Sequence, residues 1–249
     1  MNDFRISSVR EFINIIEADT FEYRGIPFVR TFFYRGVQNF HAYKLIPSVA
    51  RTWDGNLNHL RDIEKSIMDK FKTRAPAHLV FRPSNDWEWL MLGQHHGLPT
   101  RLLDWTMNPL VALYFACTGD NHLSADGAVY RLSGLDQLQP EYFSHPDYSN
   151  PFSIDRDYYI FPPHITPRIT AQSSAFTVSK NPIEPLEIPF IDKDRGPNDT
   201  IIIRADSKGK ILKQLIDLGI GPSTLFPGID GLCKQIADEA SVAKRLFAP

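Results

Sequence analysis

One short stretch constrains this chain more than any other. Residues 94–117 place two histidines, an arginine and an aspartate among bulky apolar side chains. A helix is predicted before this stretch, over 84–94. A second helix is predicted after it, where Asn108 precedes Pro109 in the arrangement favoured at helix starts. The segment between them, Gly97–Thr106, is therefore expected to be a loop or short strand fixed at both ends.

The polar residues of this segment have two interpretations. Leu102, Leu103 and Trp105 would anchor the segment against the core, so the interleaved charges would lie beside an apolar wall. Charges in such a place are costly unless they are paired or directed at a ligand. The structural interpretation is an internal pair between Arg101 and Asp104, with the histidines as ordinary hydrogen-bonded groups. The functional interpretation is a binding site.

Composition limits the protein class. The chain has 249 residues, 43% hydrophobic and 22% charged, which suits one globular domain with a sizeable core. Its net charge of −2 does not indicate a broad nucleic-acid surface. Cys117 and Cys233 lie in apolar helical patterns and are interpreted as core residues of a reduced, cytoplasmic protein. No run is long enough to span a membrane, so no membrane partner is expected.

The remaining pattern predicts an α+β fold with one mixed or antiparallel sheet flanked by helices. A strand over Phe28–Gly36 ends in Arg35, where an arginine fork could reach an anion and the glycine could let a ligand approach. A surface arginine in a hairpin is the alternative. Further strands are expected at 128–132, 175–178 and 201–203, and further helices at 57–71, at 208–218 and near the end of the chain.

Two other observations bear on function. Residues 136–167 carry few structural signals and are interpreted either as a lid or substrate loop, or as an excursion without a role. His95 and His96 are adjacent and point in different directions on a regular element, so no metal site is predicted. The chain also lacks a phosphate-binding glycine loop and a nucleophile elbow.

Several motifs together resemble the FRG domain family, which is named for a Phe/Tyr-Arg-Gly tripeptide. They are residues 33–36, 94–106, 109–116, 168–176 and 224–227. The resemblance covers nearly the whole chain, so 1–249 is expected to form a single FRG domain. The family occurs largely in bacteria and phage, often beside defence genes, which implies a defence or toxin-type effector. Two departures are Tyr34 at the first tripeptide position and Ser174 where many relatives have glycine.

A weaker resemblance points to chemistry. Residues 33–36 and 104–116 are similar to two elements of the Arg-Ser-Glu class of ADP-ribosyltransferases, which implies a split sheet and NAD as cofactor. On that resemblance the catalytic residues are Arg35, His95, Asp104 and Gln172. Ligand-binding roles are expected for Tyr34, Gly36, Gln94, His96, Thr100, Arg101, Trp105, Thr106, Arg168 and Phe176. Tyr158 or Phe176 would stack on nicotinamide. Gln172 stands where that class has a catalytic glutamate, so Asp104 is the candidate for the missing charge.

Three hypotheses follow. The first is an enzyme that transfers ADP-ribose from NAD to a protein or nucleic-acid acceptor, or cleaves NAD. The second is a module that recognises a nucleotide or phosphorylated ligand without turnover. The third is a metal-independent nuclease with His95 as acid or base. A carboxylate near Arg35, from Asp104, Glu141 or Asp155, would favour the enzyme, whereas a pocket containing only donors would favour the binding module.

Overall fold

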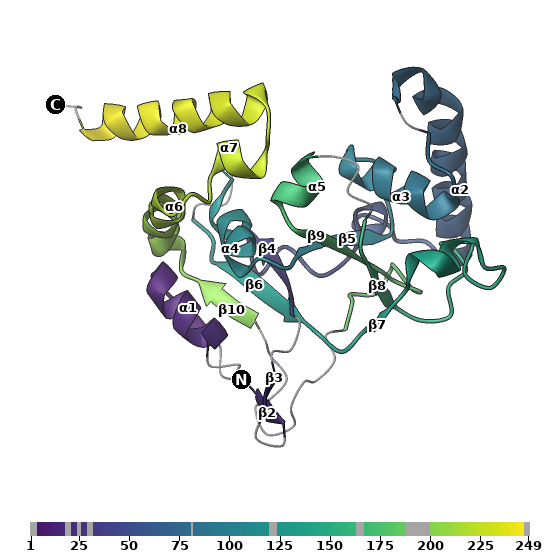
Figure 1. Cartoon of the computed structure of the whole chain (residues 1–249), viewed down its shortest axis with the longest axis horizontal. Coiled ribbons are helices and arrows are strands. Elements are labelled where there is room, and N and C mark those ends of the chain that lie inside the picture. The colour runs from purple at the N-terminus through teal and green to yellow at the C-terminus, as the bar shows by residue number, and fades with distance from the viewer. Residues whose placement is uncertain are drawn as a thin grey trace.

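The computed structural model describes residues 4–17, 21–23, 26–28, 32–80, 82–119, 124–162, 167–187 and 200–246. These residues form an α+β fold around an eight-stranded mixed sheet with the order β1-β10-β6-β4-β5-β9-β8-β7 (Figure 1). The strands of this sheet are β1 (Phe4–Ile6), β4 (Phe33–Val37), β5 (Leu102–Thr106), β6 (Gly127–Leu132), β7 (Asp136–Gln137), β8 (Tyr158–Ile160), β9 (Ser174–Val178) and β10 (Thr200–Ile203). A separate two-stranded sheet joins β2 (Phe21–Tyr23) to β3 (Ile26–Phe28).

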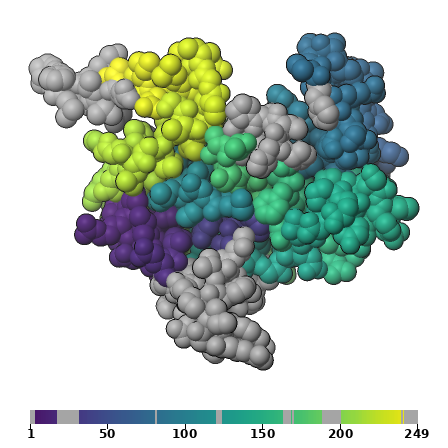
Figure 2. All heavy atoms as spheres, viewed as in Figure 1, coloured from purple at the N-terminus to yellow at the C-terminus, as the bar shows by residue number. Residues whose placement is uncertain are grey.

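Helices cover one face of the sheet in two groups. They are α1 (Val9–Glu17), α2 (Leu57–Arg74), α3 (Asp86–His95), α4 (Pro109–Cys117), α5 (Pro167–Ala171), α6 (Lys208–Asp217), α7 (Pro222–Leu225) and α8 (Ile229–Leu246). α1, α4 and α6 pack with β1, β10, β6 and β4, whereas α2 and α3 pack with β5, β9 and β8. In Figures 1 and 2, α8 and α2 stand on opposite sides of the molecule.

The sheet opens in its middle. Neighbouring strands on either side of β4 and β5 pair through several residues, but β4 and β5 share one aligned pair, Tyr34 with Thr106. Beyond that pair the two strands diverge. The sheet is therefore continuous but nearly split, and the opening lies between the two groups of helices.

Side-chain alternation decides which groups reach the opening from each face. Tyr34 lies in the core beneath α4, and its neighbour Phe33 packs on the opposite face with Leu45 and Trp105. Arg35 follows Phe33 at a spacing of two, so it points toward the face away from α4. Asp104 aligns with Phe176 on the face covered by α3.

Gly36 is explained by helix packing. A β-carbon at this position would overlap the carbonyl oxygen of Ala112 and lie 2.7 Å from the amide nitrogen of Ala116. α4 can rest directly on β4 only because the strand has glycine and the helix has alanines at the contact. The expected close approach at Gly36 is therefore made by a helix of the same chain, although the residue also lines the cavity described below.

Most predicted elements are present, with some changes. The expected strand over 28–36 is two strands, β3 and β4, and residues 29–31 lie outside the described part of the chain. The segment before Thr106 ends in the strand β5, and Asn108 caps α4 by accepting a hydrogen bond from the Leu110 amide at 3.0 Å. Cys117 is buried as expected, but Cys233 is exposed, because α8 packs mainly on α7 and leaves Leu232 and Ile236 accessible.

The segment expected over 136–167 is described as far as residue 162 and again from 167, and residues 163–166 lie outside the described part of the chain. Residues 136–162 pack into the core and do not line the opening. The side chains of Leu138, Phe143 and Ile154 are buried in the core beside α3. Phe143 stacks on Trp87, whose indole nitrogen donates to the carbonyl of Tyr148 at 2.7 Å. Between β7 and β8 the segment has only one short helical turn, Pro140–Ser144, so its irregular sequence reflects packing with little regular secondary structure.

Candidate functional site

A cavity of about 740 Å³ occupies the opening between β4 and β5. Its walls come from β4, β5, β9, α4, the end of α3, α5 and the loop after β4. The charged side chains that line it are Arg35, Lys44, Arg51, Asp104 and Arg168. Among the described residues, four arginine and lysine side chains thus face one carboxylate, although the whole chain has a net charge of −2. The cavity is therefore suited to an anionic ligand.

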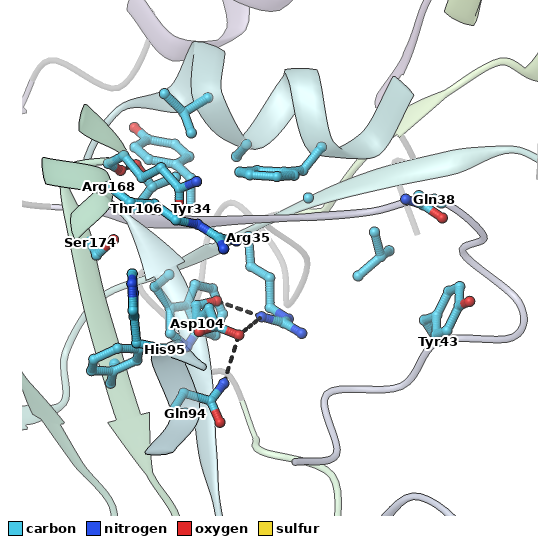
Figure 3. A pocket seen from close by; sticks show the side chains of 18 of the residues that line it. Tyr34, Arg35, Gln38, Tyr43, Gln94, His95, Asp104, Thr106, Arg168 and Ser174 are labelled. Carbon is cyan, nitrogen blue, oxygen red and sulfur yellow. Dashed lines mark hydrogen bonds and ion pairs between the residues drawn. The ribbon is translucent and has the colours of Figure 1, made fainter. Parts of the chain in front are cut away.

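Arg35 spans the gap that the diverging strands leave. One terminal nitrogen, Nη1, donates to the backbone carbonyl of Asp104 at 2.6 Å and lies 3.7 Å from the Asp104 carboxylate (Figure 3). The side chain thus joins β4 to β5 beyond their one aligned pair. Burial lowers the pKa of Arg35, the Asp104 carboxylate opposes that shift, and the nearby charge of Arg51 adds to it. An arginine remains charged under such shifts, so the cavity keeps a fixed positive group at its centre.

Asp104 is held by a chain of hydrogen bonds. The Thr100 hydroxyl accepts from the Leu102 amide at 3.1 Å and donates to Gln94 Oε1 at 2.6 Å. Gln94 must then turn its amide nitrogen toward Asp104, and Nε2 donates to Oδ2 at 2.9 Å. Ser48 holds this chain by accepting from the Thr100 amide at 3.1 Å. The carboxylate is thereby fixed in position, while 58% of its side-chain surface stays accessible.

The two histidines lie at the end of α3 and line the same cavity. Their rings meet edge to face with centroids 5.0 Å apart. Burial lowers the pKa of His95, the neighbouring His96 and Arg168 lower it further, and Asp104 acts in the opposite direction. His95 is therefore a neutral imidazole near neutral pH, able to accept a proton or a hydrogen bond.

The turn between α5 and β9 is tied to β5. The Thr106 hydroxyl donates to the Gln172 carbonyl at 2.6 Å and accepts from the Asn108 amide at 3.0 Å. Gln172 itself donates through Nε2 to the Leu225 carbonyl at 3.0 Å. Ser173 adopts a positive φ of 46°, and its carbonyl accepts from the Met107 amide. Thr106 therefore organises the wall of the cavity, and the Gln172 side-chain oxygen is left with no protein partner among the described residues.

The structure separates the predicted site residues into two sets. Those that line the cavity are Tyr34, Arg35, Gly36, Gln94, His95, His96, Asp104, Trp105, Thr106, Arg168, Gln172 and Phe176. Thr100 and Arg101 lie outside it and are 2% and 0% exposed. Thr100 acts through Gln94, as described above.

Arg101 forms a buried ion pair that its position in the sequence did not predict. Nε donates to Glu64 at 2.9 Å, Nη2 donates to the second oxygen of the same carboxylate, and Nη1 donates to the Ser179 carbonyl at 3.4 Å. The expected internal Arg101–Asp104 pair is therefore wrong: Arg101 pairs with Glu64, and Asp104 pairs with Arg35. Arg101 is fully buried and does not line the cavity.

Tyr158 also lies apart from the cavity. Its hydroxyl donates to Asp155 at 2.6 Å, and its ring is buried beside α3, which leaves Phe176 as the aromatic ring of that pair in the cavity wall. Asp155 is engaged by Tyr158 and Arg156, and Glu141 is not among the lining residues. Asp104 is thus the carboxylate that reaches Arg35.

Lys44 and Arg51 are lining residues that the sequence did not single out. Lys44 lies in the loop after β4, and Arg51 directly follows the short helix Ser48–Ala50. Their signal in the sequence is only two cations in a connecting segment, which is also typical of a solvated surface.

Comparison with known proteins identifies part of the chain. Residues 30–125 match the family model of the FRG domain. The chain therefore contains an FRG domain, and the match includes β4, α3, β5 and α4, the elements around the Arg35–Asp104 pair. No curated protein and no solved structure matches the chain. The other strands of the main sheet, β1, β6, β7, β8, β9 and β10, lie outside the match.

Two further features are absent from the described residues. Across those ranges, no group of three His, Cys, Asp or Glu side chains is placed to hold a metal ion. Within the same ranges, no helix has the length and apolar character needed to cross a membrane.

Proposed function

We propose that this FRG-domain protein binds NAD or a related nucleotide in the cavity, and transfers ADP-ribose from it or cleaves it. The observation that carries the proposal is the meeting of Arg35 and the accessible carboxylate of Asp104 in a cavity of about 740 Å³. Pockets of roughly 300–1,000 Å³ accommodate small ligands and cofactors. A nucleotide with a diphosphate would need a cation at one point and, for cleavage at its ribose, a negative charge at another.

The residues would divide the work as follows. Arg35 binds the diphosphate through the donors that Asp104 leaves free. Asp104 stabilises the positive charge that develops on the ribose as the bond from C1′ to the nicotinamide nitrogen breaks and its electron pair leaves with nicotinamide. A water or acceptor group then adds to C1′, and its proton passes to His95, whose lowered pKa keeps it unprotonated.

The other walls would position the sugar and the ring. The Gln172 side-chain oxygen can accept a hydrogen bond from a ribose hydroxyl, since its nitrogen is engaged with Leu225. Phe176 supplies an aromatic surface for nicotinamide. The acceptor is a protein or nucleic-acid group in this proposal, and a role as a bacterial or phage-associated defence effector is proposed from the FRG resemblance.

A recognition module without turnover is the second candidate. It is favoured by the engagement of Asp104 with both Arg35 and Gln94, and by an amide, Gln172, where the resembled transferases have a carboxylate. In that case the same groups would bind a nucleotide and hold it intact.

The experiment measures binding and nicotinamide release separately. NAD is titrated into the purified protein by calorimetry, and nicotinamide is quantified by chromatography, for the native chain, Asp104→Asn and Arg35→Gln. We expect release by the native chain, a loss of about a hundredfold or more in turnover with binding kept for Asp104→Asn, and weakened binding for Arg35→Gln. Arg204→Gln removes an exposed cation that pairs with Asp206 at 2.5 Å, away from the cavity, and serves as the charge control.

Two results would overturn the transferase. Binding without release by the native chain would support the recognition module. Absence of both would remove NAD as a ligand, and release of nucleotides from an oligonucleotide, lost in His95→Asn, would then support the nuclease.

A further inference from the structure

We propose that Lys44 and Arg51 complete, with Arg35, a subsite for a diphosphate group on one wall of the cavity. The inference rests on the proposed function for the rest of the ligand, but its phosphate chemistry is independent of turnover. It assigns two cations of the loop after β4 to recognition and predicts that the cavity distinguishes a diphosphate from a monophosphate.

The first support is placement. Arg35 points toward the face of the sheet that Leu45 packs on, which is the face that the loop 38–51 covers. Lys44 and Arg51 belong to this loop and line the same cavity. Figure 3 shows Gln38 and Tyr43, from the same segment, across the cavity from His95 and Ser174. The loop that carries Lys44 and Arg51 therefore lines the side of the cavity opposite His95, and the charge of Arg51 acts on Arg35.

The second support is the state of each cation. Arg51 donates through Nε to the Ile46 carbonyl at 3.2 Å, which orients its guanidinium. Its two terminal nitrogens, and the ammonium of Lys44, have no protein partner among the described residues. Arg35 uses one nitrogen on Asp104 and leaves a second terminal nitrogen without a protein partner in the same ranges. The wall thus offers several charged donors that the described protein does not satisfy.

The third support is the charge balance. Arg51 is close enough to Arg35 to lower its pKa, so the two cations repel each other in the free protein. Asp104 is the one carboxylate among the described lining residues; it accepts from Gln94, and its oxygen lies 3.7 Å from Nη1 of Arg35. Like charges held together with so little compensation are expected where an anion binds.

The geometry favours two phosphates over one. A single phosphate has three or four oxygens and can engage one arginine fork and one further donor. A diphosphate has more oxygens and more charge, and it can span the separate donors of Arg35, Arg51 and Lys44 at once. Adenosine diphosphate should therefore bind more tightly than adenosine monophosphate, and pyrophosphate more tightly than phosphate.

The test uses these four anions as probes of the full chain. Calorimetric titrations at low salt compare pyrophosphate with phosphate and ADP with AMP, for the native chain, Lys44→Gln, Arg51→Gln and the double variant. We expect about a tenfold preference for each diphosphate, and a loss of about three- to tenfold in diphosphate affinity for each single variant. AMP affinity should change less, so the preference should nearly vanish in the double variant. Raising the salt concentration should weaken diphosphate binding more than AMP binding.

Arg204→Gln again provides a charge-matched control, and thermal melting verifies that each variant is folded. Equal affinities for pyrophosphate and phosphate, or unchanged diphosphate affinity in the double variant, would overturn the subsite. The two proposals fail separately. Diphosphate binding that depends on Lys44 and Arg51, in the absence of NAD turnover, would support the subsite and contradict the transferase. If the double variant keeps the turnover and NAD affinity of the native chain, the result would support the transferase and contradict the subsite.

Discussion

Arg101 and Asp104 are three residues apart, but each belongs to a different arginine–carboxylate pair: Arg101 with Glu64, and Asp104 with Arg35. The two pairs differ in burial and in the geometry of their contacts. Arg101 and Glu64 are 0% and 2% exposed, and both carboxylate oxygens of Glu64 accept from the guanidinium. Arg35 and Asp104 are 15% and 58% exposed, and their charged atoms stand 3.7 Å apart. The first pair is closed and the second is open.

The difference shows how a fold separates structural charge from available charge. Arg101 also donates to the Ser179 carbonyl, and Phe152 covers its guanidinium at 5.2 Å. It has little capacity left for a ligand. Arg35 instead makes one short hydrogen bond, to a backbone carbonyl, and its Nε has no partner in the described structure. A binding role therefore belongs to the open pair.

The largest expected effect comes from breaking the closed pair. Glu64→Gln leaves the Arg101 charge buried without compensation and should lower the free energy of unfolding by about 3–5 kcal/mol. Asp104→Asn should change it by less than about 1 kcal/mol, because the Asp104 carboxylate is 58% exposed and is screened by solvent. Urea unfolding of both variants measures the contrast. Similar losses in the two variants would contradict the division into closed and open pairs.

Gly36 is next to Arg35 in the sequence, but it contributes to core packing, where α4 rests on β4. Gly36→Ala should destabilise the protein by about 1–3 kcal/mol, since the added methyl group meets the backbone of α4. Gly209→Ala is the matched control: Gly209 lies in α6 with open space around it, so alanine there should be neutral or slightly stabilising. Thermal melting compares the two. An unchanged melting temperature for Gly36→Ala would mean that this glycine serves the ligand.

The sequence predicted the order of elements better than the partners of charges. Caps and periodicity are local, so α4 with its Asn108 cap and the strand after Gly127 could be found from neighbouring residues. The partner of Arg101 is Glu64, on a helix 37 positions earlier, and local spacing carries no signal for such a pair. The cavity gathers residues from 34 to 176, and only the FRG resemblance linked its distant parts. Lys44 and Arg51 lacked any motif, so only the fold shows that they face Arg35.

Thr100 tests how much the open pair depends on its support. Thr100→Val removes the hydroxyl that orients Gln94, so we expect a loss of about 1–2 kcal/mol in stability and, if NAD is turned over, about a tenfold fall in turnover. Thr177→Val is the control, because it removes a buried hydroxyl that accepts from Trp105 at 2.9 Å without touching Asp104. The two variants should lose similar stability while only Thr100→Val affects turnover. Equal turnover in both would show that the Gln94 chain does not position Asp104.

The smallest expected effect is the pH dependence of stability contributed by His95 at the rim of the open pair. Because burial, His96 and Arg168 lower the pKa of His95 in the folded protein, the unfolded chain binds more protons at this residue below the ordinary histidine pKa of about 6.5. Stability should therefore fall as the pH drops through about 6.5, and His95→Asn should reduce that fall.

The matched control is His78→Asn, at an exposed imidazole in the short helix Ala75–His78, outside the cavity. Unfolding midpoints at pH 5.5 and 7.5 compare the three proteins. We expect the difference between the two pH values to be smaller for His95→Asn than for the native chain, and to be unchanged for His78→Asn. A native chain that gains stability from His95 on acidification would mean that Asp104, and not burial beside Arg168, dominates its surroundings. His95 would then be a cation in the cavity, which would favour the anion-recognition module over proton transfer.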